Sequence, residues 1–304
     1  MAPPDVSIVI PVLNAEPFLP ALFAAFASQE PAPPREIILV DSNSRDRTRA
    51  LAEAQGPHVR VIPIANFSHG RSRNLGAREA RSAIVVFLSQ DACPRDAHWL
   101  AELVAPFADP TVAATFSRQV PHLDAKPMEA YFYRTHFPDG PPMRRERGSN
   151  SDLGFEDVFF SNVSSAMRRD VLLKHPFAED IIMSEDQQLA RDVLQAGYAT
   201  VYQPSSAVIH SHNYTLGEVL RRYFDSAYSL TQIFPQHGQN TSIRIGLTYL
   251  FKEMAYMLRH HPLWLPYYGC YVVARSTGAM AGHHTNRLPR ALVRNLSMHR
   301  YHWD

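Results

Sequence analysis

Residues 84–92 read Ile84-Val85-Val86-Phe87-Leu88-Ser89-Gln90-Asp91-Ala92. Five consecutive apolar residues, three of them β-branched, are typical of a strand that is buried on both faces. A polar turn follows directly, and the carboxylate of Asp91 would lose its hydration there unless it met a cation. The stretch therefore predicts a central strand of a sheet with a polar site at its carboxyl end.

Similar apolar strands alternate with helices on either side of this stretch. We expect strands at 6–10, 37–40 and 59–64, and helices at 15–28, 46–54 and 72–81. This alternation predicts an α/β fold, in which a mainly parallel sheet is covered by helices on both faces. Such sheets bind their ligands beyond the carboxyl ends of the strands. The polar clusters to consider are therefore 11–16, 41–46, 89–92 and 184–189.

The later part of the chain is less regular. We expect a mobile loop at 121–155, where proline and glycine are frequent. The remaining expected elements are a strand at 158–167, a helix at 184–195, a strand at 199–202, and helices at 216–234, 243–259 and from 263 onward. The sequence thus predicts a catalytic α/β domain over residues 1–215 and a helical region over 216–304.

Composition restricts the functional classes. With 45% apolar and 19% charged residues, the 304-residue chain is not disordered throughout. Residues 1–215 carry 20 Lys+Arg against 25 Asp+Glu, whereas 216–304 carry ten against four. A basic, aromatic tail on an acidic body indicates contact with an anionic surface, and it disfavours a nucleic-acid binder. No G-x-G-x-x-G follows the first strand, which excludes a Rossmann dehydrogenase. Only two cysteines are present, so a reducing compartment is expected.

The apolar stretch 263–282 has three interpretations. It has the minimum length for a membrane span, but Arg275 near its centre would be costly in lipid. It can instead pack on the body of the protein or on a second subunit. The interpretation we favour is an amphipathic helix at a membrane surface. The aromatic residues then expected at headgroup depth are Trp264, Tyr267, Tyr268 and Tyr271.

Taken in order, the polar motifs resemble those of family 2 glycosyltransferases, which have the GT-A fold. The resemblance covers residues 5–215 and rests on segments 7–16, 41–44, 70–76, Asp91, and Glu185-Asp186 leading to Ala196-Gly197-Tyr198. A narrower resemblance, carried by segments 67–76, 87–92, 210–216 and 222–225, is to bacterial rhamnosyltransferases.

The resemblance implies transfer of L-rhamnose from dTDP-L-rhamnose to a hydroxyl group of a lipid-linked or surface-polysaccharide acceptor, as in O-antigen synthesis. It also implies a cytoplasmic enzyme, peripheral on the inner face of the bacterial plasma membrane. A UDP-hexose donor is the alternative enzyme hypothesis, and a non-catalytic nucleotide- or glycan-binding module is a third. A homodimer interface remains the alternative role of the apolar tail.

The nucleotide base of the donor needs a surface to pack against, and the diphosphate of the donor needs positive charge. By resemblance, Asp41 accepts a hydrogen bond from N3–H of the pyrimidine, with help from Asn43. Arg73 is the expected partner of the diphosphate because its guanidinium suits phosphate oxygens, and the amino end of its helix adds N–H groups. The remaining expected donor contacts are Pro11, Val12, Asn14, Glu16, His69, Gly70 and Gln90.

A divalent cation is expected at Asp91. Many members of the family have two acids around this position, but here the first is the amide Gln90. His210 is the expected second ligand, and His212 competes because residues two apart on a strand share a face. A carboxylate and an imidazole together suit Mn²⁺ or Mg²⁺.

The transfer reaction needs a base for the acceptor hydroxyl. We expect Asp186 to fill this role, with Glu185 as the second candidate. By resemblance the reaction is a direct displacement with inversion. The diphosphate is a good leaving group once neutralised, so no general acid is required.

Overall fold

The computed structural model describes residues 5–148, 153–155, 157–234 and 239–303. The chain divides into two compact units. The first comprises 1–120, 137–180 and 185–210, and the second comprises 121–136, 181–184 and 211–304.

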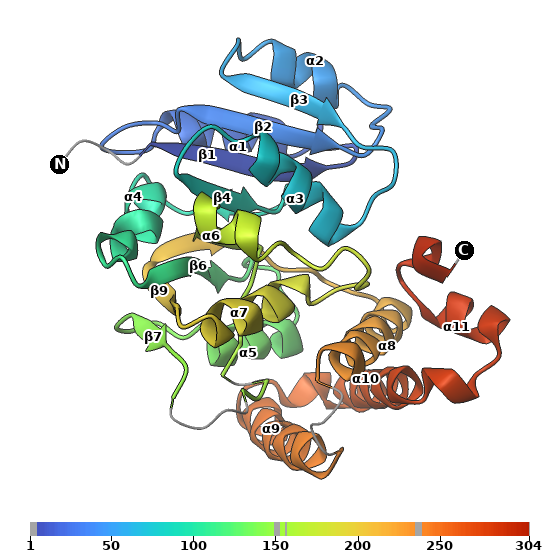
Figure 1. Ribbon diagram of the computed structural model, residues 1–304. Helices are drawn as coiled ribbons and strands as arrows, with labels where there is room; N and C mark the ends of the chain where they lie inside the picture. Colours follow the sequence, from blue (N-terminus) through green and yellow to red (C-terminus); the bar gives the residue numbers. More distant parts are fainter. Residues whose placement is uncertain (1–4, 149–152, 156, 235–238, 304) are drawn as a thin grey trace. The chain divides into compact units, whose positions relative to one another are not determined.

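The first unit is built on one mixed sheet whose strands mostly run in the same direction (Figure 1). Its order is β3-β2-β1-β4-β8-β6-β9-β5, and β7 pairs with β9. The strands are β1 (Val6–Val12), β2 (Glu36–Asp41), β3 (Val59–Pro63), β4 (Ile84–Leu88), β5 (Cys93–Pro94), β6 (Val112–Val120), β7 (Met143–Arg145), β8 (Ser164–Arg168) and β9 (Ala199–Ile209).

Strands β1 to β4 are mutually parallel, as the uniform apolar runs predict. Strand β8 then enters antiparallel between β4 and β6, and β9 returns parallel to β6. The helices of this unit are α1 (Leu19–Ala27), α2 (Thr48–Glu53), α3 (His69–Glu79), α4 (Trp99–Val104), α6 (Arg169–Lys174) and α7 (Glu185–Gln195). The carboxyl ends of β1, β2, β4 and β9 therefore point the same way.

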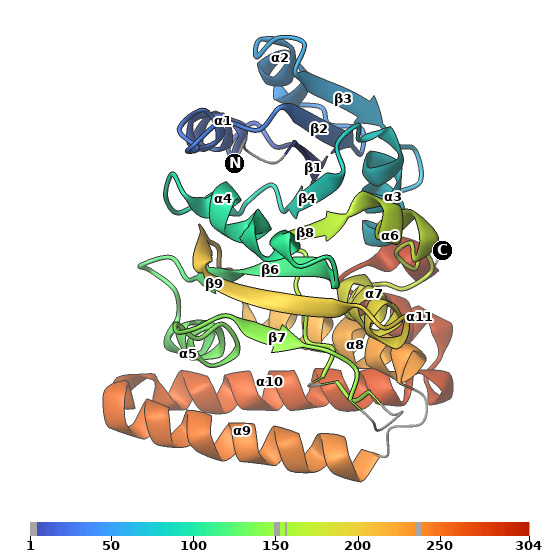
Figure 2. The same cartoon turned by 60° about the vertical axis from the view of Figure 1, so that its left-hand side comes forward.

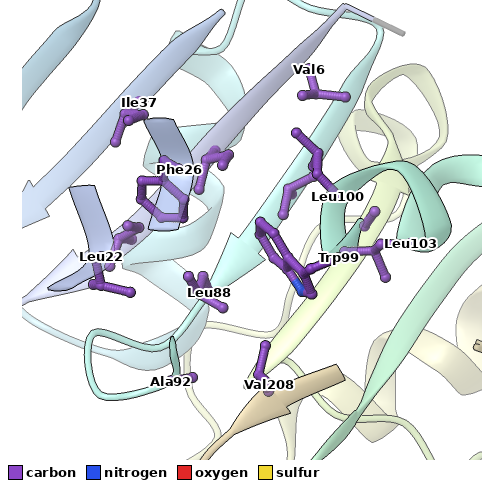
Figure 3. Close-up of a cluster of buried hydrophobic side chains, with 14 of the residues drawn as sticks. Val6, Leu22, Phe26, Ile37, Leu88, Ala92, Trp99, Leu100, Leu103 and Val208 are labelled. Carbon is purple, nitrogen blue, oxygen red and sulfur yellow. The ribbon is translucent and has the colours of Figure 1, made fainter. Parts of the chain in front are cut away.

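The core of the first unit lies between the sheet and helices α1 and α4 (Figure 3). Trp99 is fully buried there, stacks on Phe26 at 6.2 Å between ring centroids, and donates from its indole nitrogen to Ser164 at 2.9 Å. On the other side of the sheet, α3 approaches β1 very closely. A Cβ on Gly76 would lie 2.2 Å from a Val9 methyl carbon, so only glycine fits at this position.

Residues 121–155 differ from the expected mobile loop. Helix α5 (Pro127–His136) and strand β7 lie within this stretch, and α5 belongs to the second unit. The proline and glycine residues flank these elements rather than interrupting them. Residues 149–152 lie outside the described residues, so that part of the expectation is not addressed.

The second unit is helical (Figure 2). Besides α5 it contains α8 (Leu216–Ile233), α9 (Gln239–His260), α10 (Leu265–His283) and α11 (Arg290–Leu296). Helices α8 and α10 pack so closely that a Cβ on Gly278 would lie 2.2 Å from the carbonyl oxygen of Leu220. None of the helices in the described part of the chain combines the length and apolar character that crossing a membrane requires.

The tyrosines expected at headgroup depth have a different role. Tyr268 and Tyr271 are buried in the core of the second unit. Tyr267 is half-buried and hydrogen-bonds the Lys126 ammonium at 3.1 Å. Only Trp264 of the four is exposed. The expectation was wrong for Tyr268 and Tyr271, because helical periodicity shows that an aromatic face exists but not what covers it.

Candidate active site

The turns that follow β1 and β2 are joined by reciprocal hydrogen bonds. The Asn14 amide nitrogen donates to Ser44 Oγ at 2.8 Å, and the Arg45 amide nitrogen donates to Asn14 Oδ1 at 2.9 Å. Both turns require a residue with positive φ, at Asn14 (50°) and Asn43 (70°), and asparagine tolerates this conformation better than most residues. Two predicted donor-binding residues thus shape one rigid rim.

Glu16 adds a second link between these turns. Its carboxylate accepts from the Arg47 backbone at 2.9 Å and from Arg47 Nε at 2.7 Å. These hydrogen bonds hold the pKa of Glu16 below its usual value. Pro11 and Val12 form the last residues of β1 and pair in parallel with Val40 and Asp41 of β2.

Asp41 ends β2 and is fully buried. Burial opposes ionisation of its carboxyl, but hydrogen bonds from Ser44 at 2.9 Å and Arg49 Nε at 2.8 Å outweigh it, so the pKa of Asp41 is lowered. Asp41 is therefore a charged anchor of the turn. Its expected contact with a pyrimidine base stays a prediction.

Gln90 ties the turn after β4 to the turn after β1. Its amide oxygen accepts from the Leu13 backbone nitrogen at 2.9 Å, and its amide nitrogen donates to the Leu13 carbonyl at 3.3 Å. The observed role of Gln90 is thus to set the spacing of the two turns. Its expected contact with the donor stays a prediction.

The amino end of α3 packs against the segment before α7. A Cβ on Gly70 would lie 2.1 Å from the Ala178 carbonyl oxygen, which explains a glycine here. One turn later, Asn74 exchanges hydrogen bonds with the Phe177 backbone at 2.9 and 3.0 Å. His69, the first residue of the helix, packs its ring edge-on to Phe67.

Arg73 is directed into the protein rather than into solvent. Its side chain is buried, and Nη1 lies 2.5 Å from a carboxylate oxygen of Glu185, which opens α7. The Nε atom of Arg73 is buried and has no hydrogen-bond partner in the part of the chain that the structure describes. The two residues, 112 positions apart in sequence, therefore form a buried ion pair.

Asp186 follows Glu185 in the first turn of α7 and is half-buried. Its carboxylate accepts from the Asn162 backbone nitrogen at 3.1 Å and from the Gln187 backbone nitrogen at 2.9 Å. Removal from solvent, followed by the adjacent charge of Glu185, raises the pKa of Asp186 to about 7.

Glu185 behaves in the opposite way. Burial opposes its ionisation, but the charges of Arg73 and His69 outweigh burial and lower its pKa. One carboxyl therefore stays ionised while its neighbour titrates near neutrality. Carboxyls with separated pKa values of this kind mark candidate acid–base sites.

The predicted metal ligands Asp91 and His210 come together. Strand β5 pairs Cys93 with Ile209, which brings the turn after β4 to the end of β9. His210 Nε2 lies 3.7 Å from an Asp91 carboxylate oxygen. Strand β9 ends at Ile209, so His210 and His212 do not share a strand face, but His212 still lies with Asp91 and His210 as expected.

Gln119 orients the His210 ring. His210 Nδ1 donates to Gln119 Oε1 at 3.0 Å, which leaves Nε2 as the nitrogen that faces Asp91. Metal-binding histidines are commonly held by such a bond on their other ring nitrogen. The ligand atoms of Asp91, His210 and His212 all lie within 4.8 Å of one another, so one carboxylate and two imidazoles form a donor set that fits a divalent cation.

Backbone pairing also brings Asp186 toward the end of β4. The Ser89 backbone nitrogen donates to the Val163 carbonyl at 2.9 Å, and the preceding residue, Asn162, is the one that bonds Asp186. The candidate base thus lies beside the segment that enters β8, at the same edge of the sheet as the turn that carries Asp91. This arrangement can bind a charged ligand and accept a proton beside it.

Sequence reasoning missed three residues of this site: Asn162, Gln119 and Arg49. Asn162 and Gln119 belong to no polar cluster after a predicted strand, and only the pairing of β8 and β6 with their neighbours brings them here. Arg49 lies one helical turn beyond the cluster 41–46. The sequence signal for it is an arginine eight residues after Asp41.

Residues 7–175 match the family described as "Glycosyl transferase family 2". The chain is 31% identical over 303 residues to the O-antigen chain rhamnosyltransferase RfbN of Salmonella typhimurium, covering 98% of this chain and 96% of RfbN. It is 32% identical over 305 residues to the O-antigen chain rhamnosyltransferase WbaN of Salmonella anatum, with coverage of 99% and 96%.

Solved structures share the fold at low sequence identity. The mannosyltransferase PcManGT from Pyrobaculum calidifontis, in complex with GDP-Man and Mn²⁺, matches with a TM-score of 0.56 at 19% identity, covering 99% of this chain and 85% of PcManGT. Glucosyl-3-phosphoglycerate synthase from Mycobacterium tuberculosis matches with a TM-score of 0.55 at 20% identity, with coverage of 76% and 79%.

Proposed function

Because the chain belongs to glycosyl transferase family 2 and has the GT-A fold, we propose that it moves L-rhamnose from dTDP-L-rhamnose to an acceptor hydroxyl with inversion. The family and the fold are the ones that the sequence predicts. The donor is proposed because RfbN and WbaN, similar over nearly their whole length, are O-antigen chain rhamnosyltransferases. The proposed acceptor is a lipid-linked or surface-polysaccharide glycan.

The main support for this proposal is the position and the raised pKa of the Asp186 carboxyl. The carboxyl is positioned by the Asn162 backbone and by α7, and its pKa of about 7 suits a general base at neutral pH. In the proposed step, the acceptor hydroxyl gives its proton to Asp186 while its oxygen bonds the anomeric carbon of the donor. The bond from that carbon to the diphosphate oxygen breaks, and its electron pair leaves with dTDP.

Glu185 and Arg73 influence this proposed step through their charges. Their buried ion pair keeps Glu185 charged, and burial together with that charge raises the pKa of Asp186 to about 7. We therefore propose Asp186 rather than Glu185 as the base. Arg73 remains the proposed source of positive charge near the diphosphate, together with the backbone N–H groups at the start of α3.

We propose that Asp91 and His210 hold Mn²⁺ or Mg²⁺, with Gln119 orienting the imidazole. A bound divalent cation would neutralise charge on the diphosphate as it leaves. The rim formed by Asn14, Glu16, Asp41, Asn43 and Gln90 is proposed to enclose the nucleotide. We assign these roles to the catalytic portion, residues 1–215.

A panel of donors tests the proposed specificity. The protein with Mn²⁺ is heated alone and with equal concentrations of dTDP-rhamnose, UDP-glucose, UDP-galactose or UDP-GlcNAc, because the ligand with the lowest Kd then raises the melting temperature most. We expect the largest rise with dTDP-rhamnose. A larger rise with a UDP-hexose would replace the donor, and no rise with any nucleotide sugar would contradict the transferase proposal.

The metal assignment is tested by titrating dTDP into the protein with and without Mn²⁺. We expect Asp91→Asn and His210→Ala to lose the part of dTDP affinity that depends on Mn²⁺. His212→Ala, at the third member of the cluster, should reduce it less than His210→Ala does, because Gln119 holds the His210 ring. The reverse result for the two histidines would make His212 the ligand.

A further inference from the structure

Helix α9 has two dissimilar faces. Its inner face carries Glu253 and Met257, which are buried in the core of the second unit. A second face carries Leu247, Phe251, Met254 and Leu258, at intervals of four, three and four residues, so the four side chains form one stripe along the helix. All four are exposed, Phe251 by 71% and Leu258 by 56%. We call these four residues the α9 stripe.

The apolar surface continues at the turn into α10. Leu263 is 94% exposed, and the indole of Trp264 is also exposed. Tryptophan beside exposed aliphatic side chains is the composition that helices at a lipid–water boundary present. Exposed aliphatic side chains gathered in this way are unusual on the surface of a soluble protein that has no partner.

The charges around the stripe have one sign. Lys252, Arg259 and His260 are exposed on α9. Among the described residues from 216 onward, each acidic side chain is either buried or engaged in a helix cap. Asp225 and Glu253 are buried, and Glu218 closes the capping box of α8 with Thr215. Apart from Glu218 in its cap, the exposed charges on the described part of these helices are therefore cationic.

We propose that the α9 stripe, with Leu263 and Trp264, inserts among the headgroups of an anionic lipid bilayer. Apolar side chains would leave water, and the flanking Lys252 and Arg259 would meet the lipid phosphates. A second copy of the chain is the less suitable occupant, because two such surfaces would bring like charges together. The inference moves the membrane contact from the tyrosines of α10, which are buried, to α9.

Sedimentation with lipid vesicles tests the proposal. The full chain is mixed with vesicles of phosphatidylcholine alone or of phosphatidylcholine with phosphatidylglycerol. We expect binding to the anionic vesicles, weakened by salt, and weak binding to the neutral ones. The double variant Phe251→Glu/Leu258→Glu should bind anionic vesicles at least about tenfold more weakly, because it removes apolar contact and adds negative charge.

Leu173→Glu is the matched control, since Leu173 is an exposed leucine on a helix of the other unit. It should bind vesicles like the unmodified protein. Circular dichroism and melting temperature establish that both variants are folded, and Lys252→Ala/Arg259→Ala tests the charge contribution if the double variant fails to fold. Light scattering gives the oligomeric state.

Equal vesicle binding by the unmodified protein and a folded stripe variant would overturn the proposal. So would a dimer that dissociates in the stripe variant without any binding to vesicles, because the occupant would then be a second copy. Neither result would bear on the catalytic residues, which are tested by donor binding and transfer.

Discussion

Among the described residues, the Arg73–Glu185 pair of the sheet unit and the Arg275–Glu253 pair of the helical unit are both buried, and they differ in what surrounds them. In the helical unit, Glu253 accepts from both terminal nitrogens of Arg275, at 3.2 and 2.8 Å, and from the Tyr268 hydroxyl at 2.9 Å. The Arg275 guanidinium also lies over three tyrosine rings, at 5.5 to 5.9 Å from their centroids. This pair is enclosed and satisfied.

The Arg73–Glu185 pair of the sheet unit is less complete. Among the described residues, Arg73 Nε is buried without a hydrogen-bond partner, and a second carboxyl, Asp186, follows Glu185 in sequence with its pKa raised to about 7. A satisfied buried pair holds helices together, whereas in the second pair the Glu185 charge adds to burial in raising the pKa of the neighbouring Asp186 carboxyl. The difference favours the Arg73–Glu185 pair as the one that lies beside the proposed base.

The largest expected effect is on transfer by Asp186→Asn. The amide cannot accept the acceptor proton, so turnover should fall about 10²–10⁴-fold, measured as dTDP released with acceptor present. Donor binding should be nearly unchanged. Transfer at the unmodified rate would show that Asp186 is not the base.

The same variant provides a stability control. The folded protein disfavours the charged form of Asp186, so this group destabilises the fold increasingly as pH rises from about 4 toward 7, and the cost persists above pH 7. Asparagine removes the cost. Asp186→Asn should therefore unfold at equal or higher urea concentration than the unmodified protein at pH 8, and a large loss would indicate a structural role instead.

Breaking the enclosed pair should change stability and leave chemistry intact. Glu253→Gln leaves the Arg275 charge buried without its counter-charge, which should cost about 3–5 kcal/mol in the free energy of unfolding, measured by urea denaturation. Transfer per folded molecule should stay constant. The double variant Glu253→Gln/Arg275→Met should recover part of the loss, and a cost under about 1 kcal/mol for the single variant would mean that the pair is not tightly enclosed.

Two glycines extend the comparison to the backbone. In the sheet unit, Gly70→Ala would place a methyl group against the Ala178 carbonyl and should cost about 1–3 kcal/mol. In the helical unit, Gly269 lies inside α10 with open space around it, so Gly269→Ala should stabilise by about 0.5–1 kcal/mol. Melting temperatures that move in the same direction would contradict this reading of the two surroundings.

Much of the fold could be predicted because uniform apolar runs identify buried parallel strands. Strands β1 to β4 and helices α7 and α8 lie close to their expected positions. Strand β6 and helix α4 were not predicted, although both are largely buried. The sequence predicts a loop where the structure has helix α5, because prolines and glycines around a segment do not show whether a helix lies between them.

For the site, rules about strand ends identified individual residues but not their partners. Asp91 and His210 were expected together, and β5–β9 pairing brings them together. Arg73 was expected to face a phosphate, yet its carboxylate partner Glu185 lies 112 residues away, and no local pattern connects them. Gln119 lies inside strand β6, and a single amide in a strand does not predict a functional role. Its role is evident only from its hydrogen bond with His210.

The pH dependence of transfer tests the central claim most directly. In the unmodified protein, kcat/KM should fall below about pH 7 as Asp186 becomes protonated. Glu185→Gln removes the neighbouring negative charge and should move this limb down by about one pH unit. A limb in the ordinary carboxyl range near pH 4 in the unmodified protein, or the same limb in both proteins, would contradict the claim that the Arg73–Glu185 pair prepares Asp186 as the base.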